Sequence, residues 1–127
     1  MQIANSTQEF EALIKNCAPG LVTSEQGFAD HLNSFAPAQG MTQEQKQYAI
    51  ESAHAHKNGG ITHFYYRDIM DSMSRSDFAD FLAKLGIGPT LFFFTFDYYC
   101  KAPGAIGTGT CQPNKNSICH TLSDGTC

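Results

Sequence analysis

The composition of the chain changes abruptly at Cys100, and this boundary constrains the fold more than any other feature. Residues 100–127 contain no Phe, Tyr or Trp, and Gly, Thr, Ser, Asn and Pro dominate them. Such a segment cannot bury enough apolar surface to offset the entropy lost when it is ordered. We therefore expect two parts, an acidic helical body over residues 1–99 and a flexible or cross-linked tail over 100–127.

The body contains repeated signals for helix starts. Ser or Thr stands three residues before Glu or Gln in the segments 6–9, 23–26 and 42–45, a spacing typical of the capping box. Another helix is predicted after Ser76, where apolar residues recur at helical spacing. The pattern over 61–73 fits a helix or a strand, and we favour a helix. The predicted fold class is therefore all-α or nearly so: four to five short helices, one aromatic strand-like segment and a non-helical cysteine-bearing tail.

The aromatic segment is the stretch 91–99, Leu-Phe-Phe-Phe-Thr-Phe-Asp-Tyr-Tyr. We expect it to be buried, as a strand or irregular segment packed against the helices. The alternative is a docking surface, because exposed aromatic side chains at this density are costly without a partner.

The charge of the chain excludes some classes of partner. The formal net charge is -4 over 127 residues, so electrostatics gives no reason to bind nucleic acid or an anionic membrane. No apolar run approaches the roughly 20 residues of a membrane-spanning helix. The first residues also lack the pattern of a secretory signal. We expect synthesis in the cytoplasm, with export of the tail after processing.

Hydroxyl groups and thiols are interleaved along the tail. Dehydration of Ser or Thr gives an electrophilic alkene, to which a nearby thiolate can add and close a thioether ring. The candidate positions for modification, as thioether or disulfide, are Cys100, Thr108, Thr110, Cys111, Ser117, Cys119, Thr121, Ser123, Thr126 and Cys127.

This arrangement resembles the precursors of ribosomally made, modified peptides, the lanthipeptides in particular. The resemblance implies that residues 1–99 act as a leader gripped by a modifying enzyme. It also implies that the core over 100–127 is converted to thioether rings and released. The alternative function is a small acidic interaction protein, such as an inhibitor, an immunity protein or a regulatory factor, that binds a protein partner. Neither function is enzymatic.

A third hypothesis is a cysteine hydrolase that uses Cys17 and His63. The segment 16–22 resembles the nucleophile segment of NlpC-type peptidases. However, Cys17 falls near the end of a predicted helix, where the helix dipole raises the pKa of a thiol. We therefore favour a buried core cysteine at this position.

Metal binding has candidate residues but lacks the usual spacing. Zinc or copper(I) could be held by a set from the tail, Cys100, Cys111, Cys119, His120 and Cys127. A second set is His54, His56 and His63, for which the favoured role is a contact near a helix end. Structural zinc sites usually contain a Cys-x-x-Cys pair, and the tail has none. We therefore predict no metal and no cofactor.

Overall fold

The computed structural model describes residues 2–101 and 109–127, and these residues form a mixed α/β fold. The prediction of an all-α fold is therefore wrong. The α-helices are α1 (Thr7–Lys15), α2 (Glu25–Ser34), α3 (Gln43–Ser52), α4 (Arg67–Asp71), α5 (Arg75–Lys84) and α6 (Pro89–Thr95), with a 3-10 helix η1 (Ala36–Gly40). The strands are β1 (His54–Ala55), β2 (Ile61–Tyr65), β3 (Phe96–Lys101) and β4 (Thr110–Cys119). Within the described residues, none of the helices has the length and apolar character needed to cross a membrane.

The expected local signals account for four of the helices. Thr42 forms a complete capping box at the start of α3. Its hydroxyl accepts from the Gln45 N–H (3.1 Å), and the Gln45 side chain accepts from the Thr42 N–H (2.9 Å). Ser6, Ser24 and Ser74 cap α1, α2 and α5 in the simpler way, each through its side-chain oxygen. Helices in these four regions are confirmed, although two cap residues differ from the predicted ones: Ser24 and not Thr23 caps α2, and Ser74 and not Ser76 caps α5.

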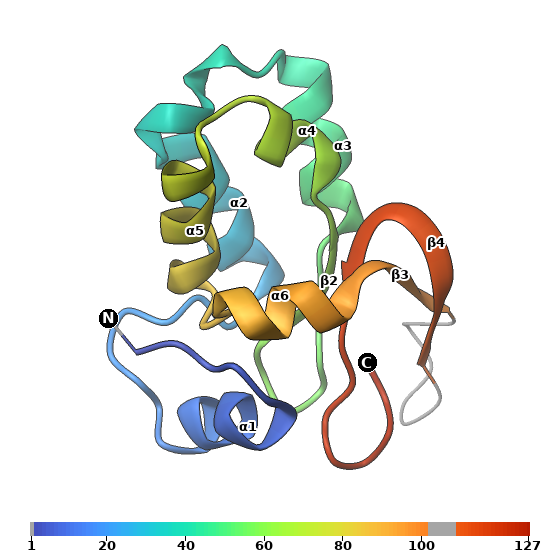
Figure 1. Cartoon of the computed structure of the whole chain (residues 1–127). Coiled ribbons are helices and arrows are strands. Elements are labelled where there is room, and N and C mark those ends of the chain that lie inside the picture. Colours follow the sequence, from blue (N-terminus) through green and yellow to red (C-terminus); the bar gives the residue numbers. More distant parts are fainter. Residues whose placement is uncertain (1, 102–108) are drawn as a thin grey trace.

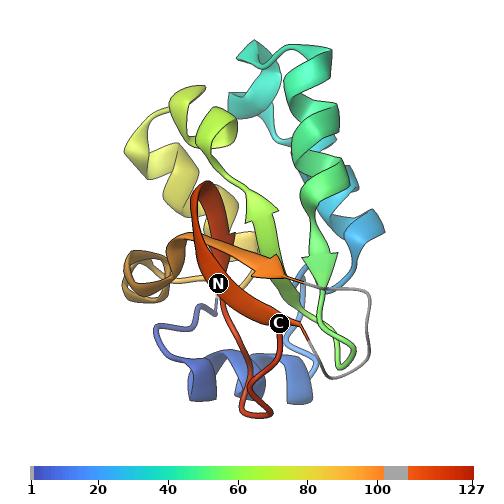
Figure 2. The same cartoon turned by 90° about the vertical axis from the view of Figure 1, so that its right-hand side faces the viewer.

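The four strands form one antiparallel sheet in the order β1-β2-β4-β3. The preference for a helix over 61–73 is wrong in its first half, because residues 61–65 form β2. Residues 61–65 pair with the neighbouring β1 on one side and with the distant β4 on the other. The non-local pairing with β4 overrides the local helical pattern. Figure 2 shows β2 between the short β1 and the arching β4.

Strand β4 is strongly curved. Its first part pairs with β3, with Cys111 opposite Cys100, and its last part pairs with β2, with Cys119 opposite His63. The ends approach so closely that the Cα atoms of Cys111 and Cys119 are 5.7 Å apart. Figure 1 shows this strand as the arch beside β3. The residues from 110 to 119, expected in a flexible or cross-linked tail, thus form an inner strand of the sheet.

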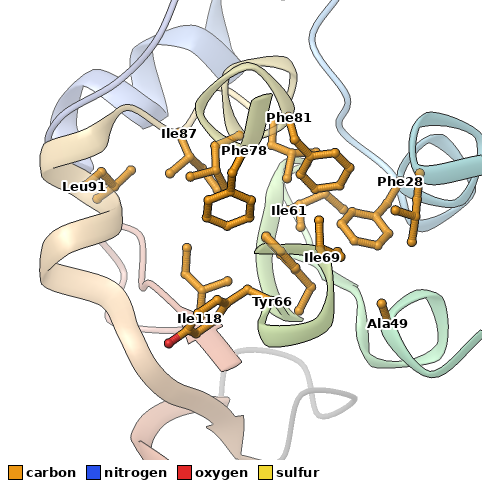
Figure 3. Close-up of a cluster of buried hydrophobic side chains, with 14 of the residues drawn as sticks. Phe28, Ala49, Ile61, Tyr66, Ile69, Phe78, Phe81, Ile87, Leu91 and Ile118 are labelled. Carbon is orange, nitrogen blue, oxygen red and sulfur yellow. The ribbon is translucent and has the colours of Figure 1, made fainter. Parts of the chain in front are cut away.

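The core lies between the helices and the sheet. In Figure 3 the rings of Phe28 and Phe81 lie close together near Ile61, and their centroids are 5.9 Å apart in an edge-on arrangement. Ile118 from β4 joins the same cluster and is fully buried. The tail therefore contributes to the main core.

The segment after β4 reaches back to the first helix. The N–H and the hydroxyl of Ser123 each donate to the carboxylate of Glu11 on α1, at 2.7 Å. Figures 1 and 2 both show this turn near α1, at the end of the molecule opposite α3 and α4. Leu122 is buried in the main cluster, as Ile118 is. The tail is therefore anchored to the body both before and after Cys119.

Candidate functional site

The most unusual surface of the described residues is on α6. The helix begins at Pro89, whose missing N–H costs nothing at the first helical position. Leu91 and Thr95, four residues apart, are buried. The residues between them on the opposite side, Phe93 and Phe94, are 66% and 70% exposed. The expectation that residues 91–99 form a buried strand or irregular segment is therefore wrong in two ways: residues 91–95 belong to a helix, and Phe93 and Phe94 are exposed.

Four exposed aromatic residues lie together here, and we call them the aromatic patch: Phe93, Phe94, Phe96 and Tyr98. The rings of Phe93 and Phe94 are 5.4 Å apart, and those of Phe93 and Phe96 are 6.3 Å apart. Phe96 and Tyr98, on β3, are 37% and 39% exposed. The patch thus runs from α6 onto the edge strand of the sheet.

A polar network fixes the backbone beneath the patch. Asp97 and Asn116 both have positive φ, at 64° and 76°, and they lie where the register between β3 and β4 shifts. One carboxylate oxygen of Asp97 accepts from the Tyr66 hydroxyl (2.8 Å) and from the Asn116 N–H (3.0 Å). Arg67 adds a hydrogen bond to the Asn116 side chain (3.1 Å). These hydrogen bonds therefore hold Asp97 and Asn116 in the strained left-handed conformation.

The same network shifts the acidity of its members. Burial and the hydrogen bond to Asp97 raise the pKa of Tyr66 to about 12. The N–H of Asn116, with the Tyr66 hydroxyl and the Arg67 charge, lowers the pKa of Asp97. At neutral pH the network therefore contains a neutral phenol and an ionised carboxylate, which suit one another as donor and acceptor.

Hollows flank α6 on both sides. One, of about 420 Å³, lies between Phe94, Tyr98, His120 and the Cys111–Cys119 disulfide. The other, of about 690 Å³, has mostly apolar walls, and its lining includes Ile3, Met70, Met73, Phe78 and Phe92. The exposed phenylalanines thus stand on a ridge between two depressions.

His120 forms part of the wall of the smaller hollow. Its Nε2 lies 3.0 Å from the Ile61 carbonyl, which makes Nε2 the protonated nitrogen. Its Nδ1 is buried and has no hydrogen-bond partner among the described residues. Burial lowers the pKa of His120 to about 4, so the ring is neutral at pH 7. Nδ1 is then an unpaired acceptor that the protein itself buries.

The predicted modification residues have different surroundings. Cys100 is bonded to Cys127 and Cys111 to Cys119. Thr108 lies outside the described residues. Of the other hydroxyl residues, Ser117 is buried, Thr121 and Thr126 are half-buried, and Thr110 and Ser123 are exposed.

The hydroxyl of Thr126 belongs to a second polar cluster, which closes the end of the tail. This hydroxyl donates to Asp124 (2.8 Å), and His56 Nε2 lies 3.0 Å from the same hydroxyl oxygen and 3.2 Å from the carboxylate. The backbone and hydroxyl groups of Thr126 lower the pKa of Asp124. His56 therefore helps to hold the tail against the body, a role that sequence reasoning missed.

The two residues of the hydrolase hypothesis have separate environments. Cys17 follows α1 with φ at 50° and is exposed, so the prediction of a buried core cysteine is wrong. His63 on β2 has its Nδ1 at 2.7 Å from the Ser52 carbonyl, and burial lowers its pKa. No hydrogen bond joins Cys17 to His63 among the described residues.

Known proteins offer no functional analogy for these features. No protein-family model, curated protein or solved structure matches this chain. The aromatic patch, its flanking hollows and the tail cysteines are therefore the features from which a function can be argued.

Proposed function

We propose that the chain is a small binding protein that docks onto a protein partner through the aromatic patch. The observation that carries this proposal is the exposure of Phe93 and Phe94, about two-thirds of each side chain, on one turn of α6. Exposed contiguous apolar surface is rare on monomeric proteins unless it is used for binding. A large aromatic side chain also contributes much of the binding energy where it enters a partner's pocket.

The rigid support of the patch favours binding. The N–H of Thr90 donates to the Asn5 side chain (3.1 Å), and Leu91 and Thr95 anchor α6 from below. Asp97 holds the first residues of β3 through Tyr66 and Asn116. A surface already held in place loses little conformational entropy when it binds.

The shape and charge of this surface define the partner. A ridge of aromatic rings between two hollows requires a partner with an apolar depression flanked by projecting side chains. The net charge of -4 favours a partner that is neutral or basic. This chemistry agrees with the small acidic interaction protein expected as an alternative from the sequence.

The position of the tail favours this function over the modified-peptide precursor. Strand β4 lies inside the sheet between β2 and β3, and its Ile118 is part of the main core. Release of residues 100–127 would remove that strand and leave apolar surface on the body. A leader that is to be separated from its core peptide is not expected to share a sheet and a hydrophobic core with it.

The test is a crosslinking experiment on the purified full chain, incubated with extract of its native host. A photoreactive amino acid replaces either Thr90, which lies beside the patch on α6, or Gln47, which lies away from it on α3. We expect a discrete adduct from position 90 and none from position 47. An excess of unlabelled wild-type chain should abolish the adduct.

The matched competitors are a double variant of the patch and a single variant outside it. Phe93→Ser/Phe94→Ser should fail to compete. Tyr48→Ser should compete fully, because Tyr48 is an exposed aromatic residue (57%) on α3, outside the patch. The proposal is wrong if the patch variant competes as well as the wild type, provided that both variants melt cooperatively.

A further inference from the structure

The tail cysteines bring their sulfur atoms to one place, although they are far apart in the sequence. The sulfur atoms of Cys100, Cys119 and Cys127 are buried and all lie within 4.8 Å of one another. They belong to two different disulfides, and the fourth sulfur, that of Cys111, is bonded to Cys119. We call these four residues the cysteine cluster.

The backbone holds the cluster together independently of its disulfides. Cys100 and Cys111 face each other in the ladder between β3 and β4, and Cys119 is paired with His63 on β2. Cys127 is held through its own backbone: its N–H donates to the Gly109 carbonyl (3.0 Å), and its carbonyl accepts from the Thr62 hydroxyl (2.6 Å). Reduction would therefore leave four thiols beside one another in a folded framework.

We propose that the reduced cysteine cluster binds one zinc ion through its four sulfur atoms. A dithiol reductant supplies two electrons and two protons to each disulfide, and is itself oxidised to a disulfide. The four thiols so formed release their protons to solvent as the thiolates coordinate the metal. Zinc and thiolate are matched in softness, and a site of four cysteines is a common structural zinc centre.

The geometry requires only small movements. Zn–S bonds of about 2.3 Å in a tetrahedron place the sulfur atoms about 3.8 Å apart. The sulfur of Cys119, within 4.8 Å of those of Cys100 and Cys127, needs to approach them by no more than about 1 Å. The sulfurs of Cys100 and Cys127 must instead move apart to this spacing once their disulfide is broken. Cys111 must rotate away from Cys119 once their bond is broken. The sequence has no Cys-x-x-Cys pair to place two ligands close together. Here strand pairing does this instead, because it places Cys100 opposite Cys111.

Disulfides and zinc thus give two ways to close the same part of the fold. Oxidised, the cluster links the end of β3 to the chain terminus and the two ends of β4 to each other. Reduced, one metal ion would link the same segments. The fold would then persist in both oxidising and reducing surroundings.

The test uses cobalt(II) as a spectroscopic probe and then zinc. The full chain is reduced with a phosphine, freed of reductant without air, and titrated with Co²⁺. We expect sulfur-to-cobalt charge-transfer bands and the visible bands of tetrahedral cobalt at one equivalent. One equivalent of Zn²⁺ should abolish them and raise the melting temperature of the reduced chain.

Three controls separate the cluster from other thiols. Cys17→Ser removes the exposed cysteine outside the cluster and should bind cobalt as the wild type does. Cys119→Ser should weaken cobalt binding by at least about tenfold. The oxidised wild type, which is folded, should give no bands and no zinc-dependent shift in melting. The proposal is overturned if the reduced wild type gives no tetrahedral bands, if Cys17→Ser loses them, or if zinc leaves the melting of the reduced chain unchanged.

Discussion

Cys100 and Cys111 lie directly opposite each other on β3 and β4, yet each forms its disulfide with a different cysteine. Cys100 is bonded to Cys127 and so ties the edge strand to the chain terminus. Cys111 is bonded to Cys119 and so ties together the two ends of β4. The pairing therefore closes the arch of β4 and anchors the terminus, which a direct bond between the two strands would not do.

The two disulfides should differ in their contribution to stability. In the chain-entropy model, a cross-link over 27 residues contributes about 3.5 kcal/mol and one over 8 residues about 2.5 kcal/mol. Cys100→Ala/Cys127→Ala should therefore lose about 1 kcal/mol more than Cys111→Ala/Cys119→Ala in urea denaturation. Equal losses, or the reverse order, would show that loop length does not decide the relative contributions of the two disulfides.

The mass of the isolated protein tests the form of the tail cysteines. With two disulfides, reduction should add four hydrogen atoms, about 4 Da, and free four thiols for alkylation. Thioether rings would instead give losses of ~18 Da for each dehydrated Ser or Thr, and their sulfurs would resist alkylation after reduction. We expect the first result on protein from its native host, and the second would restore the precursor hypothesis.

Substitutions of exposed and of buried residues on α6 should differ in their effect on the free energy of unfolding. Phe93→Ser/Phe94→Ser removes two exposed rings and should change the free energy of unfolding by no more than about 1 kcal/mol. Leu91→Ala removes a buried side chain and should cost about 2–5 kcal/mol. Chemical denaturation measures both, and a large loss in the double variant would show that the patch is part of the core.

His120 should make the fold sensitive to mild acid. Its pKa is lowered to about 4 in the folded chain, whereas an unfolded histidine titrates near 6.5. Between these two values the unfolded chain binds more protons, so the free energy of unfolding should fall as the pH is lowered from about 6.5 to 4. His31 and His63 act in the same direction, because burial also lowers the pKa of each.

The titration of the His120 ring by nuclear magnetic resonance checks this directly. Its ring signals should move near pH 4, and its Nε2 should be the protonated nitrogen at pH 7 because of the bond to the Ile61 carbonyl. A midpoint near 6.5 in the folded chain would mean that the ring is not buried in this way.

A second pH effect is expected from Asp97. Its pKa is lowered by the N–H of Asn116 and the hydroxyl of Tyr66, so its contribution to stability is present above about pH 4 and lost as the pH falls through its folded pKa. Asp97→Asn keeps a side chain that tolerates positive φ but cannot ionise. Between pH 4 and 2 the free energy of unfolding of this variant should fall by less than that of the wild type. Equal losses would show that the Asp97 carboxylate does not cause the acid sensitivity.

The helices could be predicted where their signals are local. Ser6 and Thr42 cap helices through side chains only a few residues away, and the amphipathic pattern of α5 is equally local. Strand β2 could not be distinguished from a helix, because its partners are β1 and the distant β4. Strand β4 contains Pro113 and several polar residues, which disfavour a strand locally, and long-range pairing overrides this.

The candidate site could be predicted only in part from the sequence. Its aromatic density pointed to residues 91–99, and a docking surface was one of the two expected roles. The exposure of Phe93 and Phe94 depends on α6 placing Leu91 and Thr95 inward, which requires a helix where a strand-like segment was expected. The convergence of the four tail sulfurs depends on register and curvature, which residue spacing does not reveal.

The place of β4 in the sheet also has a consequence for biosynthesis. A ribosome makes β1, β2 and β3 before β4, yet β4 is the strand that lies between β2 and β3. Until it emerges, β2 presents an open edge to other nascent chains, and α6 has no completed sheet beside it. Chaperones that cover this open edge until β4 is available should therefore increase the yield of native protein.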